Sequence, residues 1–119
     1  MRSIIRSNRQ LSELRASVRR DVAAPGDDDQ VIRDFVMAVN EVVAEALSHG
    51  ASDTSSIDVR WLRRLHPRAE LYAEIRRTSG TPTSLLHEGI VSRILLHTAE
   101  RIDVQERIGG SVITIRSRI

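Results

Sequence analysis

Apolar residues recur at helical spacing up to Gly50, and beyond it they mostly alternate with polar residues. A first amphipathic helix is predicted where apolar residues return every three or four positions, at Leu11, Leu14, Val18 and Val22. Ser7, followed three residues later by Gln10, matches a capping box ahead of this helix. Pro25-Gly26 is expected to end it.

A second, longer helix is predicted after the three acids at 27–29, because acidic side chains favour the positive end of a helix. Its apolar residues keep the helical period without interruption: Val31, Ile32, Phe35, Val36, Val39, Val42, Val43, Ala46 and Leu47. Gly50 is a typical residue just past the C-terminal end of a helix.

Strict alternation then predicts strands. One strand carries Ile57, Val59 and Trp61 on a single face, and the next carries Leu71, Ala73 and Ile75. Further strands are expected over 3–6, 102–108 and 112–119, the last two joined by a turn at Gly109-Gly110. A third helix is predicted by the spacing of Leu85, Leu86, Ile90, Ile94 and Leu95.

These elements follow the order βααββαββ. Each helix and strand is apolar on one side, which favours an α+β fold: a two-layer α/β sandwich with the helices on one face of a mixed sheet. A length of 119 residues is enough for one domain and too short for two, so residues 1–119 are expected to form a single domain. The other face of the sheet would meet solvent or a second subunit.

The composition excludes several kinds of catalytic and metal-binding site. All 18 basic residues are Arg, and the absence of Cys excludes disulfides, thiolate metal sites and a cysteine nucleophile. The absence of Lys excludes a Schiff base and a Walker-type phosphate loop. No apolar stretch is long enough to span a membrane, and the N-terminal MRSIIRSNRQ lacks the apolar core of a signal peptide. We therefore expect a cytoplasmic protein with no membrane partner.

Charge is unevenly distributed along the chain. Residues 1–20 carry a net charge of +5, residues 21–58 carry −8 and residues 59–119 carry +5. Such asymmetry predicts a surface for a charged partner. The aromatic residues are Phe35, Trp61 and Tyr72 alone, which argues against a base-stacking surface and so against nucleic acid as that partner.

The polar side of the second helix holds Glu41, Glu45 and His49, four residues apart. This spacing places the three side chains in one stripe along the helix. Two interpretations stay open on spacing alone. The stripe is a solvated helix face, or its two carboxylates and imidazole form a site for magnesium and for general-base chemistry.

The stretch VMAVNEVVAEALSHG, residues 36–50, resembles the nucleotide-site helix of the histidine-kinase-like (Bergerat-fold) ATPases, and among them the anti-sigma-factor serine/threonine kinases. SNRQLSELRASVRR resembles their opening helix, and GIVSRILLHTAERIDVQERIGGSVITIRSRI resembles their closing helix and hairpin. The resemblance implies ATP and Mg²⁺ as cofactors, phosphate transfer to a partner serine, and a bacterial transcription regulator that forms a homodimer. Its protein partner would be a sigma factor or an anti-sigma antagonist.

Carried over by position, the resemblance assigns Glu41 as the general base. Glu45 stands where the family has the Asn that binds magnesium, so it is the candidate metal ligand. The remaining candidates for nucleotide binding are His49, Gly80, Gly89, Gly110 and Ser111.

Two departures weaken the implied nucleotide site. Arg77 or a neighbour occupies the position of the family's adenine-reading Asp, and a guanidinium cannot accept a hydrogen bond from an adenine amino group. His87 replaces the first glycine of the family's paired glycines. Three hypotheses follow: an active kinase of the anti-sigma type, a partner-binding or dimerisation module of the same fold without catalysis, and an Arg-rich binder of nucleic acid or of an acidic partner. We favour the family fold with weakened or absent catalysis.

Overall fold

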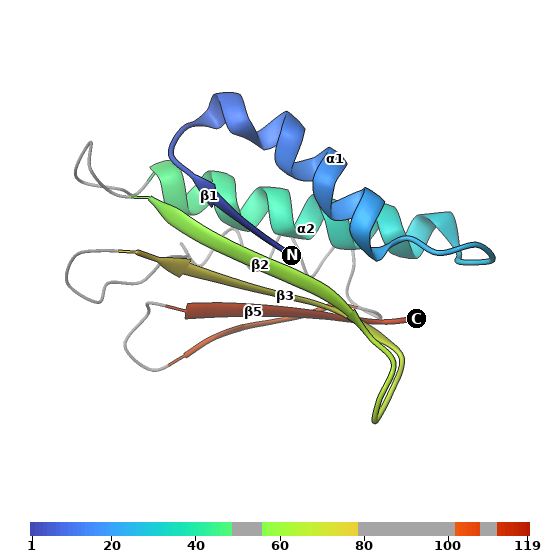
Figure 1. The fold of residues 1–119 in the computed structure, drawn as a ribbon. Coiled ribbons are helices and arrows are strands. Elements are labelled where there is room, and N and C mark those ends of the chain that lie inside the picture. Colours follow the sequence, from blue (N-terminus) through green and yellow to red (C-terminus); the bar gives the residue numbers. More distant parts are fainter. Residues whose placement is uncertain (49–55, 79–101, 108–111) are drawn as a thin grey trace.

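Two helices cover one face of a β-sheet in the computed structural model (Figure 1), which describes residues 1–48, 56–78, 102–107 and 112–119. The elements of these residues are β1 (Arg2–Ile5), the short 3-10 helix η1 (Asn8–Gln10), α1 (Leu11–Val22), α2 (Asp29–Ser48), β2 (Ile57–Arg64), β3 (Glu70–Arg77), β4 (Ile102–Glu106) and β5 (Val112–Arg118). The predicted third helix and the predicted Gly109-Gly110 turn lie outside the described residues.

The start of the first helix confirms the predicted role of Gln10. Its side-chain oxygen Oε1 accepts the backbone N–H of Arg6 at 2.6 Å and that of Ser7 at 3.2 Å. These bonds satisfy donors that the first turn of a helix leaves without partners. The helix differs from the prediction in one detail, since it opens with the single 3-10 turn η1 before α1 begins at Leu11.

The second helix follows its predicted course. The Asp28 carboxylate accepts the backbone N–H of Gln30 at 2.9 Å, one residue inside the start of α2 at Asp29. Most of the apolar residues that predicted the helix are buried, and Phe35 is fully buried between the layers. None of the helices in the described ranges is both long enough and apolar enough to cross a lipid bilayer.

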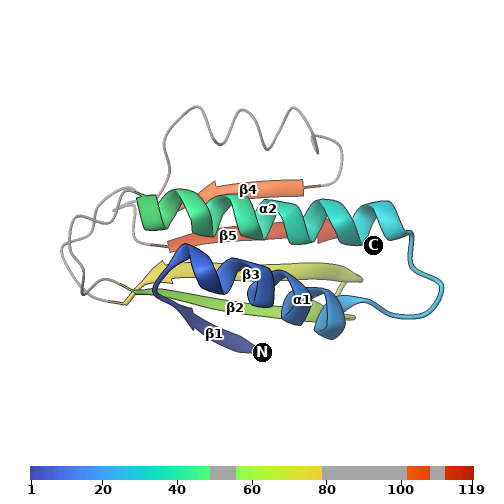
Figure 2. The same cartoon turned by 90° about the horizontal axis from the view of Figure 1, so that it is seen from above.

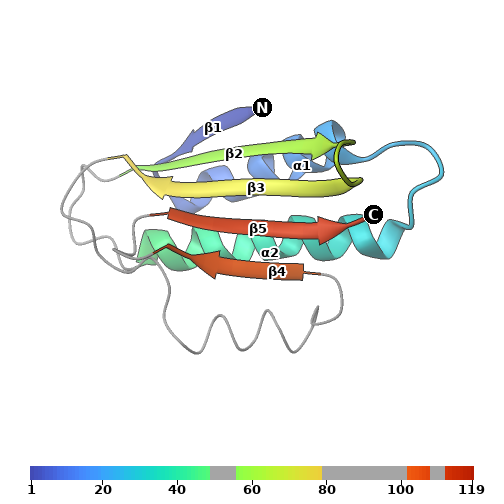
Figure 3. The same ribbon diagram turned by 90° about the horizontal axis from the view of Figure 1, so that it is seen from below.

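The sheet contains five described strands in the order β1-β2-β3-β5-β4. We expected a mixed sheet, but every described pairing is antiparallel (Figure 3). The first pair is antiparallel because an even number of long helices connects β1 to β2. The chain leaves the end of β1 along α1 and returns along α2, so β2 starts beside Ile5 and runs the opposite way, with Ile5 opposite Ile57.

The core lies between the helices and the inner face of the sheet. Viewed from above, α1 lies over β2 and α2 lies over β5 (Figure 2). The alternating residues that predicted β2 and β3 all point into this core, and Ile113 and Ile115 of β5 join them. Outward-pointing residues of the same strands form the opposite side of the sheet, which neither helix covers; we call it the open face.

An ion pair joins the two layers at the end of the molecule where α1 gives way to α2. Arg63 of β2 binds both oxygens of Asp27, at 2.6 and 2.9 Å, and also donates to the carbonyl oxygen of Val22 at 2.9 Å. The Arg63 hydrogen bonds, followed by the backbone N–H of Ala24, hold the pKa of the Asp27 carboxyl below its usual value. The same pairing raises the pKa of Arg63.

Candidate functional site

The acidic stripe of α2 lies on the side of the helix that faces away from α1. Asn40 faces α1, because its side-chain oxygen accepts a hydrogen bond from Arg15 at 2.8 Å. Glu45 follows Asn40 by five residues, which turns it about 140° around the helix axis. Glu45 therefore points away from α1, which lies on the β2 side of α2 (Figure 2).

Glu41 and Glu45 are both half-buried on this side. Glu41 makes no hydrogen bond or ion pair to another described residue. His49, the third member of the predicted stripe, lies outside the described residues. Within the described residues the stripe therefore supplies two carboxylates, and no group of three or more potential metal-ligating side chains comes together there.

Arg77, at the end of β3, points to the same end of α2. Its Nη2 donates to the carbonyl oxygen of Ala46 at 3.2 Å, in the last turns of the helix. A cation at this position is favourable, because the carbonyl groups at the end of a helix carry partial negative charge. The Nε of Arg77 is buried and finds no hydrogen-bond partner among the described residues.

The backbone beside Arg77 is held firmly. The N–H of Thr78 donates to the carbonyl oxygen of Ser56 at 3.0 Å, and the two hydroxyl groups of these residues lie 2.5 Å apart. These contacts keep the end of β3 next to the start of β2, so the direction in which Arg77 projects is set by the sheet.

The arrangement bears on the ATP and Mg²⁺ that the sequence resemblance implies. Arg77 offers only donors, and its Nη2 points to a backbone carbonyl, so this position does not fit recognition of an adenine amino group. Glu45 is a suitable oxygen ligand for magnesium, but it adds negative charge beside any bound polyphosphate. The predicted site residues Gly80, Gly89, Gly110 and Ser111 lie outside the described residues.

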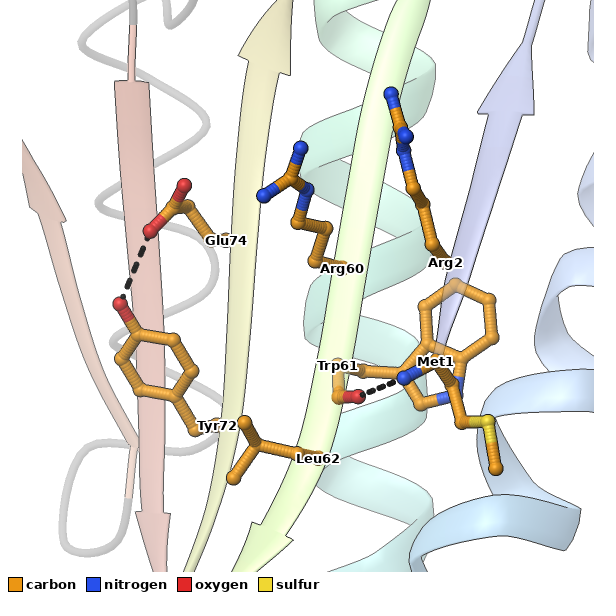
Figure 4. A pocket seen from close by; sticks show the side chains of 7 residues that line it. All are labelled: Met1, Arg2, Arg60, Trp61, Leu62, Tyr72 and Glu74. Atoms are coloured by element: carbon orange, nitrogen blue, oxygen red, sulfur yellow. Dashed lines mark hydrogen bonds between the residues drawn. The ribbon is translucent and has the colours of Figure 1, made fainter.

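A second cluster of functional groups, which the sequence analysis did not single out, lies on the open face (Figure 4). Asp58 is buried, with a side-chain exposure of 4%, and accepts hydrogen bonds from Arg2 at 2.9 and 3.3 Å. Arg60 lies 3.4 Å from the same carboxylate. A depression of about 500 Å³ beside this cluster is lined by Arg60, Leu62, Tyr72 and their neighbours.

Tyr72 stands in the middle of this face. Its ring lies between two guanidinium groups, 4.9 Å from that of Arg64 and 5.8 Å from that of Arg116. Its hydroxyl donates to Glu74 at 3.3 Å. Burial, followed by the charge of Glu74, raises the pKa of Tyr72, so the phenol stays protonated at neutral pH.

The open-face cluster had a signal in the sequence. Charged residues occupy three of the four alternate positions in each of IDVRWLRR and ELYAEIRR, between the apolar residues that predicted the strands, and the remaining positions are Leu62 and Tyr72. That alternation shows which residues share a face within one strand. It does not show which strand is the neighbour, and the antiparallel register places Arg60 directly opposite Glu74 and Leu62 opposite Tyr72.

Comparisons with known proteins yield a match in structure only. No family model matches the chain, and no curated protein sequence matches it. Among solved structures, the fold is similar to part of the blue-light activated histidine kinase EL346 of Erythrobacter litoralis, with a TM-score of 0.52 and 14% sequence identity. The match covers 90% of this chain and 40% of the kinase chain. At this identity the likeness concerns the fold, and the chain spans well under half of that protein.

Proposed function

We propose that this chain is a regulatory protein of the anti-sigma-factor-kinase type, which acts by exchanging protein partners and in which ATP binding and serine phosphotransfer are weakened or lost. The likeness of its fold to part of a histidine kinase supports the histidine-kinase-like assignment. The two carboxylates on α2 support it as well, because Glu41 and Glu45 occupy one half-buried side of the helix that resembles the family's nucleotide-site helix.

One observation carries the loss of ATP binding: the hydrogen bond from Arg77 to the Ala46 carbonyl oxygen. A nucleotide site at the end of α2 needs an acceptor for the adenine amino group, and Arg77 supplies a donor that is already engaged with the helix. Displacing it would leave the carbonyl and the guanidinium to find new partners, which costs about 1–3 kcal/mol for a buried polar group. Binding of a nucleotide would have to overcome that cost.

The metal position supports the same conclusion. Magnesium at a nucleotide site is normally shared between one or two carboxylates and the phosphates. Here Glu41 and Glu45 would both carry charge beside the polyphosphate, and a neutral Asn is missing. Phosphoryl transfer depends mainly on how the phosphates and the metal are positioned, so a general base at Glu41 would not by itself restore it.

Calorimetric titration of the full chain with ATP and magnesium tests this proposal. We expect a dissociation constant weaker than about 1 mM, equivalent to less than about 4 kcal/mol of binding free energy. Micromolar binding that is abolished by Glu41→Ala or Glu45→Ala would overturn the proposal. Glu13→Ala is the matched control, because Glu13 is an exposed acid on α1.

A further inference from the structure

The open face of the sheet carries more basic than acidic side chains. The strand registers place alternate residues of all five described strands on this face. Figure 3 shows the strands from that side. The basic residues there are Arg2, Arg60, Arg64, Arg76, Arg116 and Arg118, and the acidic residues are Asp58, Glu70, Glu74 and Asp103. The face therefore has a net positive charge.

Its acidic groups are already engaged with neighbours on the same face. Asp58 is held by Arg2 and Arg60. Glu70 pairs with Arg64 at 3.1 Å, and Glu74 pairs with Arg76. Asp103 accepts a hydrogen bond from Gln105 at 3.2 Å.

Positive charge is left over on this face. Arg116 and Arg118 are exposed and form no ion pair with another described residue. Arg2 and Arg60 keep side-chain exposures of 57% and 50% despite their contact with Asp58. Four guanidinium groups can thus reach a partner that approaches the sheet.

An apolar surface lies among these charges. Leu62 is 42% exposed and stands opposite Tyr72 in the register of β2 and β3. Both line the depression of about 500 Å³, together with Arg2, Arg60 and Glu74 (Figure 4). A ligand in this depression would meet an apolar surface between Leu62 and Tyr72, and guanidinium groups at its margin.

We propose that the open face is the docking surface for an acidic protein segment that also carries an apolar side chain. Carboxylates of the segment would bind Arg60 and Arg116, and the apolar side chain would pack between Leu62 and Tyr72. This inference rests on the proposed function in one respect, since it assigns the surface through which a protein partner is bound. Complementary charge would mainly speed association and select the partner, whereas the apolar contact would slow its release.

Nucleic acid fits this face less well. A polyphosphate would pass close to Asp58, Glu70, Glu74 and Asp103, whereas a peptide can place its own charges between them. Tyr72 is the sole aromatic residue of the chain available for stacking, because Phe35 and Trp61 are buried in the core.

Among the described residues, most acidic side chains of 21–58 lie away from the open face, Asp58 being the exception. The acidic residues of 21–58 are concentrated on α2 and the turn before it, in the layer on the opposite side of the sheet (Figure 1). These side chains therefore leave the exposed guanidinium groups of the open face unneutralised, and the proposal assigns that role to a partner.

The test is an NMR titration of the full, isotope-labelled chain with a synthetic peptide of repeated Glu-Leu-Asp-Gly units. We expect the amide signals of β2, β3 and β5 to shift, and those of α1 to stay in place. The double substitution Arg60→Glu with Arg116→Glu should weaken binding of the peptide at least about tenfold, which equals about 1.4 kcal/mol of binding free energy. The matched control is Arg6→Glu with Arg9→Glu, which makes the same change in net charge at exposed positions outside the sheet face.

Several outcomes would overturn the inference. In the titration, these are equal weakening of peptide binding by the control substitutions and shifts of amide signals confined to α2. The others are tighter binding of a single-stranded oligonucleotide than of the peptide, and self-association of the chain through this face in sedimentation velocity. Failure of the inference is distinguishable from failure of the proposed function, because the calorimetric titration with ATP concerns α2 and Arg77 and does not involve the open face.

Discussion

At the scale of single residues, the bidentate pair between Arg63 and Asp27 joins the two layers with little exposure to water. Side-chain exposures of 24% and 9% leave little water around it. Each Asp27 oxygen accepts a charged hydrogen bond, and Oδ2 also accepts the N–H of Ala24 at 2.7 Å. The pair therefore fixes the turn between α1 and α2 against the end of β2.

Asp27→Asn should lower the free energy of unfolding by about 2 kcal/mol at neutral pH, because it removes hydrogen bonds between charged groups. The pKa of Asp27 is lower in the folded state than its ordinary value of 3.8. The ion pair therefore stabilises the fold fully above pH 3.8, and this stabilisation is lost as the pH falls through the lower pKa of the folded state. Urea titrations should show the gap between wild type and variant closing as pH falls below about 4. A gap independent of pH would contradict this. Asp34→Asn is the control, because the half-buried Asp34 carboxylate accepts its hydrogen bond from the neutral Gln30 and not from an arginine.

At the scale of elements, α1 depends on a side chain that lies before its first turn. Gln10 accepts the N–H groups of Arg6 and Ser7, and its Nε2 donates to the carbonyl oxygen of Ile4 at 3.3 Å. One amide group thus ties the end of β1 to the start of the helix. The apolar side of α1 can then reach β2 without a longer connection.

Gln10→Ala should lower the free energy of unfolding by about 1 kcal/mol, the usual cost of losing a helix cap. Hydrogen exchange should report faster opening at the start of α1 than in α2, because only the first helix loses its cap. The control is Ser12→Ala, at an exposed position of the same helix. Equal effects of the two substitutions would mean that the cap is not what holds the start of the helix.

At the scale of the whole molecule, the two layers share a single continuous core among the described residues. Trp61 reports on both layers. It is 3% exposed, belongs to β2, and donates from Nε1 to Asp21 of α1 at 2.8 Å. Separation of α1 from the sheet would expose this indole.

Unfolding in urea should therefore give coincident transitions by Trp61 fluorescence and by far-ultraviolet circular dichroism, as expected for a single cooperative domain. Trp61 is the sole tryptophan of the chain, so no other indole contributes to the tryptophan fluorescence. Two separated transitions would contradict the prediction of one domain over residues 1–119. The Asp27→Asn variant should shift both signals together.

The elements themselves were predictable because periodicity is a local property. The spacing of apolar residues predicted α1, α2, β2 and β3, and the structure confirms each of them. The pairing of the strands could not be predicted in this way, since it depends on contacts between segments that are distant in sequence. This is why the sheet proved antiparallel where a mixed sheet was expected.

The candidate sites also combine features that local spacing predicts with features that depend on distant contacts. The spacing of Glu41 and Glu45 placed them on one side of a helix before any tertiary structure was considered. The bond from Arg77 to Ala46 joins residues 31 positions apart, and no local pattern indicates it. The open-face cluster likewise combines Arg2 with Asp58, which are 56 positions apart.

The sequence by itself determined the two amphipathic helices, the alternating strands and the acidic stripe, because each follows from the turn of the backbone between neighbouring residues. Tertiary structure alone decided which strands are adjacent, that Arg77 meets the end of α2, and that guanidinium groups from separate strands gather on one face. Those outcomes follow from packing the apolar sides together, which fixes the position of every polar side chain on the reverse of the same strands.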